Sequence, residues 1–385
     1  QTPWQDRLGD AMEGTSPLAP DGARFAGLLA GFDAFGSATR RSETAGVPVF
    51  ENEFWTAKQR QAHPLHEVSY RACFKPQLPR FFIEAFTGPG ACVYDPFAGR
   101  GTTLIEAALL GRRPIGNDVN PLSRLLIAPR LDPPLVADVA RRLDELKLAL
   151  PSKADAPADL LAFYHPDTLR DIARLRTYFL DHARDTIDAW IRMVCLNRLT
   201  GHSNGFFSVY TLPPNQATSA ARQRKINEAR GQVPPRRDVF EIILRKTRAL
   251  LKAPSPVHLE HAIKDNKGRV EFFETELKAF TAKDPRAEKA RAAALQKAPL
   301  PAGPGTQAAR ILTGRAERTP EIADASVDLI VTSPPFLDVV DYPTDNWLRC
   351  WFAGIDTETV PITLHRSLAD WERFVAACFR EFARI

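Results

Sequence analysis

The stretch Val93–Thr103, with the sequence VYDPFAGRGTT, limits the fold of this 385-residue chain more than any other feature. It is a short apolar run that breaks at a proline, turns on Gly99 and Gly101, and opens into a helical pattern ending near Leu110. A second β-rich run, Pro114–Asp118, follows directly. Strand, glycine turn, helix and strand in this order predict one parallel βαβ unit with a right-handed crossover.

The rest of the chain is predicted to complete this sheet around a helical insert. Short β-rich runs at 309–312 and 328–331 follow the insert, so four parallel strands are expected near residues 93, 115, 310 and 329. A doubly wound sheet usually has more strands. We therefore expect either that C-terminal strands are missing after residue 385, or that another element covers the exposed edge of the strand at 328–331.

Four parts are predicted along the chain. They are an N-terminal extension at residues 1–50, the first half of the sheet domain at 51–132, a mostly helical insert at 133–305, and the second half of the sheet domain at 306–385. Helical patterns are predicted at 23–35, 78–86, 121–131, 136–150, within 167–200, and at 271–295, 345–353 and 368–385.

Composition excludes several classes of protein. Charged residues make up 25% and hydrophobic residues 44% of the chain, as in an ordinary globular protein. The five cysteines are scattered without a C-x-x-C pair, so no zinc site, other metal site or disulfide framework is expected. No apolar run is long enough to span a membrane and no signal peptide is recognisable, so a soluble cytoplasmic protein is expected. The net charge of +5 fits a nucleic-acid partner without requiring one.

The glycine turn has the chemistry of a nucleotide-cofactor site. Glycines let backbone N–H groups approach a ligand closely, and Asp118, 19 residues after Gly99, stands where a carboxylate binds ribose hydroxyls. NAD, FAD and S-adenosylmethionine are all bound by such turns. The dinucleotide pattern G-x-G-x-x-G fails because residue 104 is leucine, which argues against NAD. A glycine turn without any ligand is the remaining alternative.

The stretch Thr332–Phe336, with the sequence TSPPF, adds a second component. It follows the strand predicted at 328–331, and ligands bind at this carboxyl edge of open α/β sheets. Two prolines lack N–H donors and leave carbonyl oxygens free to accept. Ser333 adds a side-chain oxygen, and Phe336 offers a face on which a base can stack. These acceptors suit an exocyclic amine, because accepting its hydrogens stabilises the charge that develops on the attacking nitrogen. A Pro-Pro turn that merely ends a strand is the structural alternative.

Together the two motifs resemble those of the amino-group DNA methyltransferases, which use S-adenosyl-L-methionine to methylate cytosine N4 or adenine N6. The likeness is carried by Asp95–Thr103, Gly116–Pro121 and Ser326–Phe336, within residues 63–130 and 310–354. It implies an α/β fold with a Rossmann-like, doubly wound methyltransferase sheet. Because the cofactor motif comes first and the catalytic motif last, the resemblance places target recognition in the insert.

The resemblance also implies roles for individual residues. The catalytic residues are expected to be Ser333, Pro334, Pro335 and Phe336. Contacts to S-adenosyl-L-methionine are expected from Asp95, Pro96, Phe97, Ala98, Gly99, Gly101, Thr102, Asp118 and Asn120. The segment 63–79 is expected to help hold the methionine part of the cofactor. Family members often carry an acidic residue near the third strand, where this chain has Thr313–Ala316, and Glu317 and Asp324 are weak candidates to replace it.

The preferred base depends on Ser333. Many adenine enzymes carry Asp or Asn at this position, so the Ser-Pro-Pro form favours cytosine N4. Adenine N6 and an RNA amine stay as alternatives. A non-catalytic nucleic-acid-binding subunit that keeps the methyltransferase fold is an alternative of another class.

A basic run at 216–252 predicts a nucleic-acid partner. Ten basic residues against three acidic ones give it a charge of +7, more than the net charge of the whole chain. Double-stranded DNA is the expected partner, and a cognate restriction endonuclease or another defence subunit is a further expectation, in a nucleoid-associated prokaryotic setting. A solvated charged helix face is the plainer alternative. Contacts to the nucleic acid are expected from Asn204, Arg222, Arg224, Lys225, Arg236 and Arg237.

Overall fold

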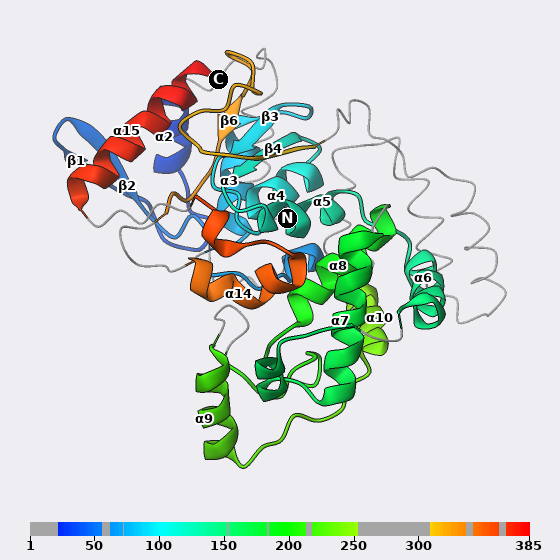
Figure 1. Cartoon of the computed structure of the whole chain (residues 1–385). Helices are drawn as coiled ribbons and strands as arrows, with labels where there is room; N and C mark the ends of the chain where they lie inside the picture. The colour runs from blue at the N-terminus through cyan, green and yellow to red at the C-terminus, as the bar shows by residue number, and fades with distance from the viewer. Residues whose placement is uncertain are drawn as a thin grey trace. The chain divides into compact units, whose positions relative to one another are not determined.

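A computed structural model describes residues 22–55, 62–71, 73–151, 154–182, 185–212, 218–252, 309–335, 342–361 and 367–385 (Figure 1). The helix predicted at 271–295 and the residue Phe336 lie outside these ranges. Within them, no helix is both long enough and apolar enough to cross a lipid bilayer.

Four parallel strands form the sheet, as predicted. They are β3 (Cys92–Asp95), β4 (Arg113–Asp118), β5 (Arg310–Thr313) and β6 (Leu329–Ile330), in the spatial order β5-β4-β3-β6. Each neighbouring pair is parallel. The chain moves outward from β3 to β4 and β5, and then returns to the other side of β3 for β6. The strand order therefore reverses between β3 and β6, and such a switch point is where open α/β sheets bind ligands.

Helices cover both faces of this sheet because side chains alternate along each strand. On one face, Val93 packs with Ile83 of α3 (Gln77–Phe86) and Ala107 of α4 (Thr102–Leu109). On the other face, Tyr94 packs with Phe382 near the end of α15 (Leu368–Arg384). The backbone oxygen of the last residue in the chain also accepts hydrogen bonds from the two residues at 326–327, just before β6. The mixed α/β fold is thus confirmed.

A close approach of helix to strand explains one glycine. A Cβ atom at Gly116 in β4 would lie 2.5 Å from Cδ2 of Leu104 in α4. Only a residue without a side chain permits α4 to lie this close to the sheet.

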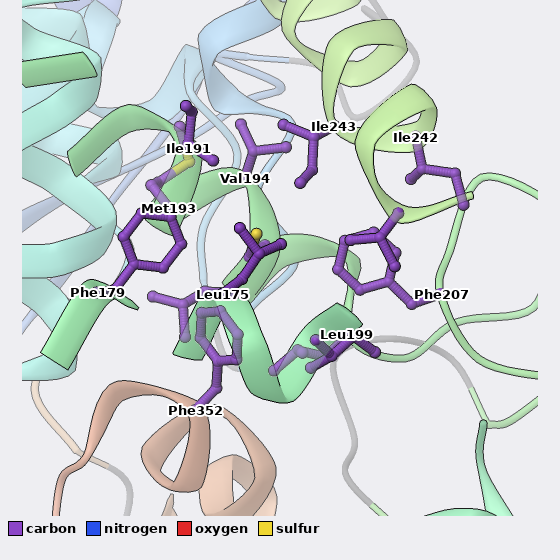
Figure 2. Close-up of a cluster of buried hydrophobic side chains, with 14 of the residues drawn as sticks. Leu175, Phe179, Ile191, Met193, Val194, Leu199, Phe207, Ile242, Ile243 and Phe352 are labelled. Atoms are coloured by element: carbon purple, nitrogen blue, oxygen red, sulfur yellow. The ribbon is translucent and has the colours of Figure 1, made fainter. Parts of the chain in front are cut away.

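A helical bundle packs beside the sheet domain. It contains α6 (Val136–Ala149), α7 (Pro166–Asp181), α8 (Thr186–Arg198), α10 (Val239–Leu250) and α14 (Tyr342–Ala353). Aspartate side chains cap α8 and α10, where Asp185 and Asp238 each accept a hydrogen bond from the backbone N–H three residues later. Figure 2 shows the apolar side chains that these helices bury together, among them Phe179, Ile243 and Phe352.

This apolar core continues across residue 133, where the sequence predicts the start of the insert. The same cluster includes Ile105 of α4 and Leu122 and Leu126 of α5 (Leu122–Leu131), all at most 1% exposed. The described helices of the insert therefore share one core with the first half of the sheet domain.

The N-terminal part contains a hairpin that the sequence analysis missed. Helix α2 (Gly22–Ala30) ends before the predicted residue 35, and β1 (Arg40–Thr44) then pairs antiparallel with β2 (Val47–Glu51). Its turn residues Ala45 and Gly46 both have positive φ, as a two-residue hairpin turn requires.

Short elements complete the described chain. They are η1 (Pro64–His66), η2 (Ala158–Ala162), α9 (Ala220–Arg230) and η3 (Thr357–Thr359).

Candidate active site

The two motifs meet at the switch point of the sheet, although they lie 237 residues apart in the sequence. Thr332 donates its hydroxyl hydrogen to Oδ1 of Asp95 at 2.6 Å. The same oxygen accepts the backbone N–H of Phe97 at 3.1 Å. Thr103 in the first turn of α4 donates to the carbonyl of Val331 at 3.0 Å. These bonds connect the end of β3 and the start of α4 to the end of β6.

Asp95 carries an unusual protonation equilibrium. Its side chain is buried at 2% exposure, and this burial raises its pKa to about 6. The bonds from Thr332 and from the Phe97 N–H oppose that rise because they favour the charged carboxylate.

The glycine turn requires its glycines. Gly99 and Gly101 have φ of +50° and +79°, in the left-handed region. A Cβ atom at Gly101 would also lie 2.6 Å from Cγ1 of Ile127 in α5. The turn therefore needs glycine at these positions for its backbone conformation and, at Gly101, for the close packing of α5. The start of α4 that follows has the N–H groups without intrahelical partners that every helix N-terminus has.

Asp118 at the end of β4 has geometry that fits a ribose. Its Oδ2 accepts the N–H of Gly99 at 2.8 Å, and its Oδ1 accepts the N–H of Asn120 at 2.9 Å. Asp118 is partly exposed as a residue, and each carboxylate oxygen has capacity for a second hydrogen bond, as from a ribose hydroxyl. Burial raises the pKa of Asp118, and the two N–H groups oppose this rise.

Asn120, one of the expected cofactor contacts, follows the end of β4. It is buried, and its Oδ1 accepts the N–H of Leu122 at 3.0 Å, at the start of α5. Its clear role in the structure is to orient that helix beside the turn.

The segment before α3 lies against the glycine turn. Arg100 donates to the carbonyl of Val68 at 2.8 Å. Arg130 in α5 is fully buried and donates to the carbonyls of Leu65, at 2.9 Å, and of Arg100. Burial lowers the pKa of Arg130 to about 9. A Cβ atom at Gly99 would stand 3.5 Å from the ring of Tyr70, so this segment borders the turn.

The turn that follows β6 has a neighbour that the sequence did not indicate. Ser333 and Pro335 are partly exposed and Pro334 is exposed. The indole Nε1 of Trp371 in α15 donates to the carbonyl of Pro335 at 3.0 Å. The sequence analysis gave this tryptophan no role, since it lies 36 residues beyond the motif on a helix with ordinary amphipathic spacing.

Helix α15 also touches the cofactor motif. The ring of Phe374, one turn beyond Trp371, lies 5.9 Å from the ring of Phe97, measured between centroids. This helix therefore contacts both motifs.

The acidic candidates near the third strand are already paired. Glu317 accepts from Arg315 at 2.8 Å. Asp324 precedes β6, at the edge of the sheet opposite the motifs, and pairs with Arg384 at 2.5 Å. Asp324 is therefore ruled out as a cofactor contact by its place in the sheet.

The residues expected to bind nucleic acid fall into two groups. Helix α9 exposes Arg222 and Lys225, while Arg224 on the same helix pairs with Asp159. In Figure 1 this helix stands at the end of the described bundle. Its attachment is polar, because the buried Gln223 donates to the carbonyl of Tyr210 at 2.9 Å.

The second group surrounds an exposed loop. Arg237 donates to Oδ1 of Asn204 at 2.8 Å, and Arg245 donates to the carbonyl of Asn204 at 3.0 Å. Arg236 is exposed, with its Nε 3.8 Å from Asp167. Lys246, by contrast, is buried and pairs with Glu67 at 2.5 Å, so the basic run is less available than its composition suggests.

Comparison with known proteins bears on this geometry. Residues 37–123, which include the hairpin, the glycine turn and Asp118, match the family model described as DNA methylase. The chain resembles the amino-group DNA methyltransferases.

Three proteins named as Type II methyltransferases share parts of the sequence. M.MjaII of Methanocaldococcus jannaschii is 32% identical over 74 residues, which are 19% of this chain and 14% of that protein. M.MvaI of Kocuria varians is 28% identical over 126 residues, 32% of this chain and 25% of that protein. M.BsoBI of Geobacillus stearothermophilus is 36% identical over 64 residues, 16% of this chain and 13% of that protein.

The likeness is thus local, because the matched stretches span a quarter or less of each relative. No solved structure matches the chain. Among the described residues, no group of three or more His, Cys, Asp or Glu side chains could hold a metal ion.

Proposed function

We propose that this chain methylates an exocyclic amine of a DNA base with S-adenosyl-L-methionine as the methyl donor. The observation that carries the proposal is the hydrogen bond from Thr332 to Asp95. It sets the end of the cofactor motif beside the Ser-Pro-Pro turn, so that a bound donor and a bound amine would share one sheet edge.

The cofactor side of this site matches the chemistry of the donor. S-Adenosyl-L-methionine, when bound, supplies an electrophilic methyl group. Asp118 would accept the ribose hydroxyls beside the glycine turn, which leads directly into the start of α4. The segment around Tyr70, which borders that turn, would hold the methionine part.

The part of the site that would bind the target base offers hydrogen-bond acceptors. The Ser333 hydroxyl and the Pro334 carbonyl would accept the two hydrogens of the amine and concentrate electron density on its nitrogen. The nitrogen then forms its bond to the methyl carbon as the carbon–sulfur bond breaks, and one amine proton leaves to solvent. This reaction needs proximity and alignment without a covalent enzyme intermediate. The target base must leave the duplex to reach such a turn.

Cytosine N4 is the proposed acceptor, because Ser333 replaces the carboxylate or amide typical of many adenine enzymes. Mass spectrometry of nucleosides from DNA incubated with protein and donor tests this. N4-methylcytosine is expected. N6-methyladenine without N4-methylcytosine would reverse the preference, and methylation of RNA alone would replace the DNA substrate.

A non-catalytic DNA-binding subunit is the competing function. Titration calorimetry with S-adenosyl-L-methionine separates the two, and Asp118→Ala is the matched control because it removes the ribose acceptor. Binding that the substitution weakens at least tenfold supports the enzyme. No heat of binding by the wild-type chain favours the subunit.

The partner of the proposed enzyme is double-stranded DNA, bound through α9 and the loop at Asn204. The similarity to proteins named Type II methyltransferases supports a setting with a cognate restriction endonuclease. Co-purification of the tagged chain from its native host tests that association.

A further inference from the structure

The Ser-Pro-Pro turn is locally stiff, because its two prolines fix φ, but it has few backbone donors with which to fix its orientation in the fold. Pro334 and Pro335 lack N–H groups, so neither can donate a backbone hydrogen bond within the turn. The two acceptors assigned to the amine are the Ser333 hydroxyl and the Pro334 carbonyl. They lie within, or directly before, the two residues that lack a backbone N–H. The orientation of the turn must therefore come from contacts with other elements.

Two such contacts bracket the acceptors. On the N-terminal side, Thr332 donates to Asp95 at 2.6 Å. On the C-terminal side, the Pro335 carbonyl accepts the indole N–H of Trp371 at 3.0 Å. Ser333 and Pro334 are the residues between these two anchors.

The helix that presents Trp371 is capped at its start and tied to another segment of the chain near its end. Ser367 caps its start by accepting the N–H of Asp370 at 3.1 Å. Near its end, Glu381 accepts the N–H of Thr319 at 2.6 Å and the Thr319 hydroxyl at 2.8 Å. Because α15 is tied to the chain before β6, the indole can serve as a fixed point for the turn after β6.

We infer that Trp371 is a positioning residue, which orients the Pro335 carbonyl and through it the acceptors that hold the amine. This inference rests on the proposed function. Misplacement of reacting groups by about 1 Å can slow a reaction on the order of 100-fold, so loss of one anchor should be visible in the transfer step.

The substitution Trp371→Phe removes the N–H donor and keeps an aromatic ring. Trp347→Phe is a matched control, because the indole of the partly buried Trp347 also donates to a backbone carbonyl, that of Thr218, at 3.2 Å. Single-turnover methyl transfer to duplex DNA is measured for both variants, together with the Kd values for donor and DNA.

We expect Trp371→Phe to slow the transfer step at least tenfold, with both Kd values within threefold of wild type. Trp347→Phe should transfer at the wild-type rate. A Trp371→Phe rate within threefold of wild type, or an equal loss in both variants, overturns the inference.

Hydrogen exchange at Thr332 and Ser333 gives a readout that does not depend on activity. Exchange there should quicken in Trp371→Phe and stay unchanged in Trp347→Phe. If the wild-type chain transfers no methyl group, the proposed function fails, and this comparison still shows whether Trp371 orders the turn. Unchanged exchange in Trp371→Phe contradicts the inference.

Discussion

Two independent constraints require glycine at position 101 in the glycine turn. Its φ of +79° disfavours any L side chain, and a Cβ atom would lie 2.6 Å from Ile127. At Gly111, which follows the end of α4, only the backbone constraint applies, since its φ is +72° and nothing lies within 4 Å of a Cβ there. The pair separates backbone strain from steric clash.

Gly101→Ala should lower the free energy of unfolding by about 3 kcal/mol, from strain and overpacking together. Gly111→Ala should cost about 1 kcal/mol, from strain alone. Urea unfolding of both variants measures these values. Equal losses would show that Ile127 moves aside and that the clash is not a constraint.

The protonation of Asp95 makes the stability of the folded chain depend on pH. Its pKa in the folded chain is about 6, above that of an unfolded aspartate, so its contribution to stability is complete at low pH and is lost as pH rises through 6. Asn at this position could still accept the bonds from Thr332 and Phe97, but it does not titrate. Wild type should therefore lose about 2 kcal/mol of stability relative to Asp95→Asn between pH 4 and pH 7.

Denaturant unfolding of both proteins across this pH range gives the difference directly. Parallel stability profiles would mean that Asp95 ionises normally in the folded chain.

At the scale of elements, the basic run is only partly available to the proposed DNA partner. The charge of the run can be read from the sequence, but its availability cannot, because its ion-pair partners are distant. Arg224 pairs with Asp159, 65 residues away, and Lys246 pairs with Glu67, 179 residues away. Arg222, Lys225 and Arg230 are also exposed on α9, and Arg230 stacks on the ring of Tyr210.

Arg222→Ala with Lys225→Ala should weaken binding to duplex DNA and reduce the slope of log K against log salt by about 1.8, as for two lost phosphate contacts. Arg141→Ala with Lys147→Ala on α6 is the control, because it removes two other exposed basic side chains. Fluorescence anisotropy at several salt concentrations measures both slopes. An unchanged slope in the α9 variant would remove this helix from the interface.

Local sequence predicted most elements well, and the misses have physical reasons. The βαβ unit has strong signals: two apolar runs, two glycines and a helical period between them. The hairpin at 40–51 had only a short Ala45-Gly46 turn as its signal, between strands that are almost entirely exposed and so lack a clear apolar alternation. Trp371 had none, since its hydrogen bond to Pro335 is a tertiary contact of a kind that periodicity does not report.

At the scale of the whole molecule, the division into sheet domain and insert is weaker than the sequence suggested. Composition separates strands from helices, but it does not reveal against which surface an amphipathic helix packs. The described helices of the insert bury their apolar faces in the cluster that also contains Ile105 of α4 and Leu122 and Leu126 of α5. The first turn of α4 carries Thr103, which bonds the end of β6.

Leu126→Ala in α5 should therefore destabilise both the sheet domain and the insert. This side chain is fully buried in the shared core, and its truncation should cost about 2–5 kcal/mol. Hydrogen exchange should then quicken in α4 and in α10 alike. Protection of α10 that stays at the wild-type level would show that the insert is an independent folding unit.

The strand order determines when the candidate site can form during synthesis of the chain. The N–H of Cys92 at the start of β3 bonds the side chain of Asp328, 236 residues later, and pairings over such distances form slowly because the intervening loop must close first. During synthesis from the N-terminus, the glycine turn and Asp118 can assemble long before β6 emerges. The segment proposed to bind the donor therefore leaves the ribosome first and the proposed acceptor turn last, and a nascent chain interrupted within the insert would contain the first motif without the second.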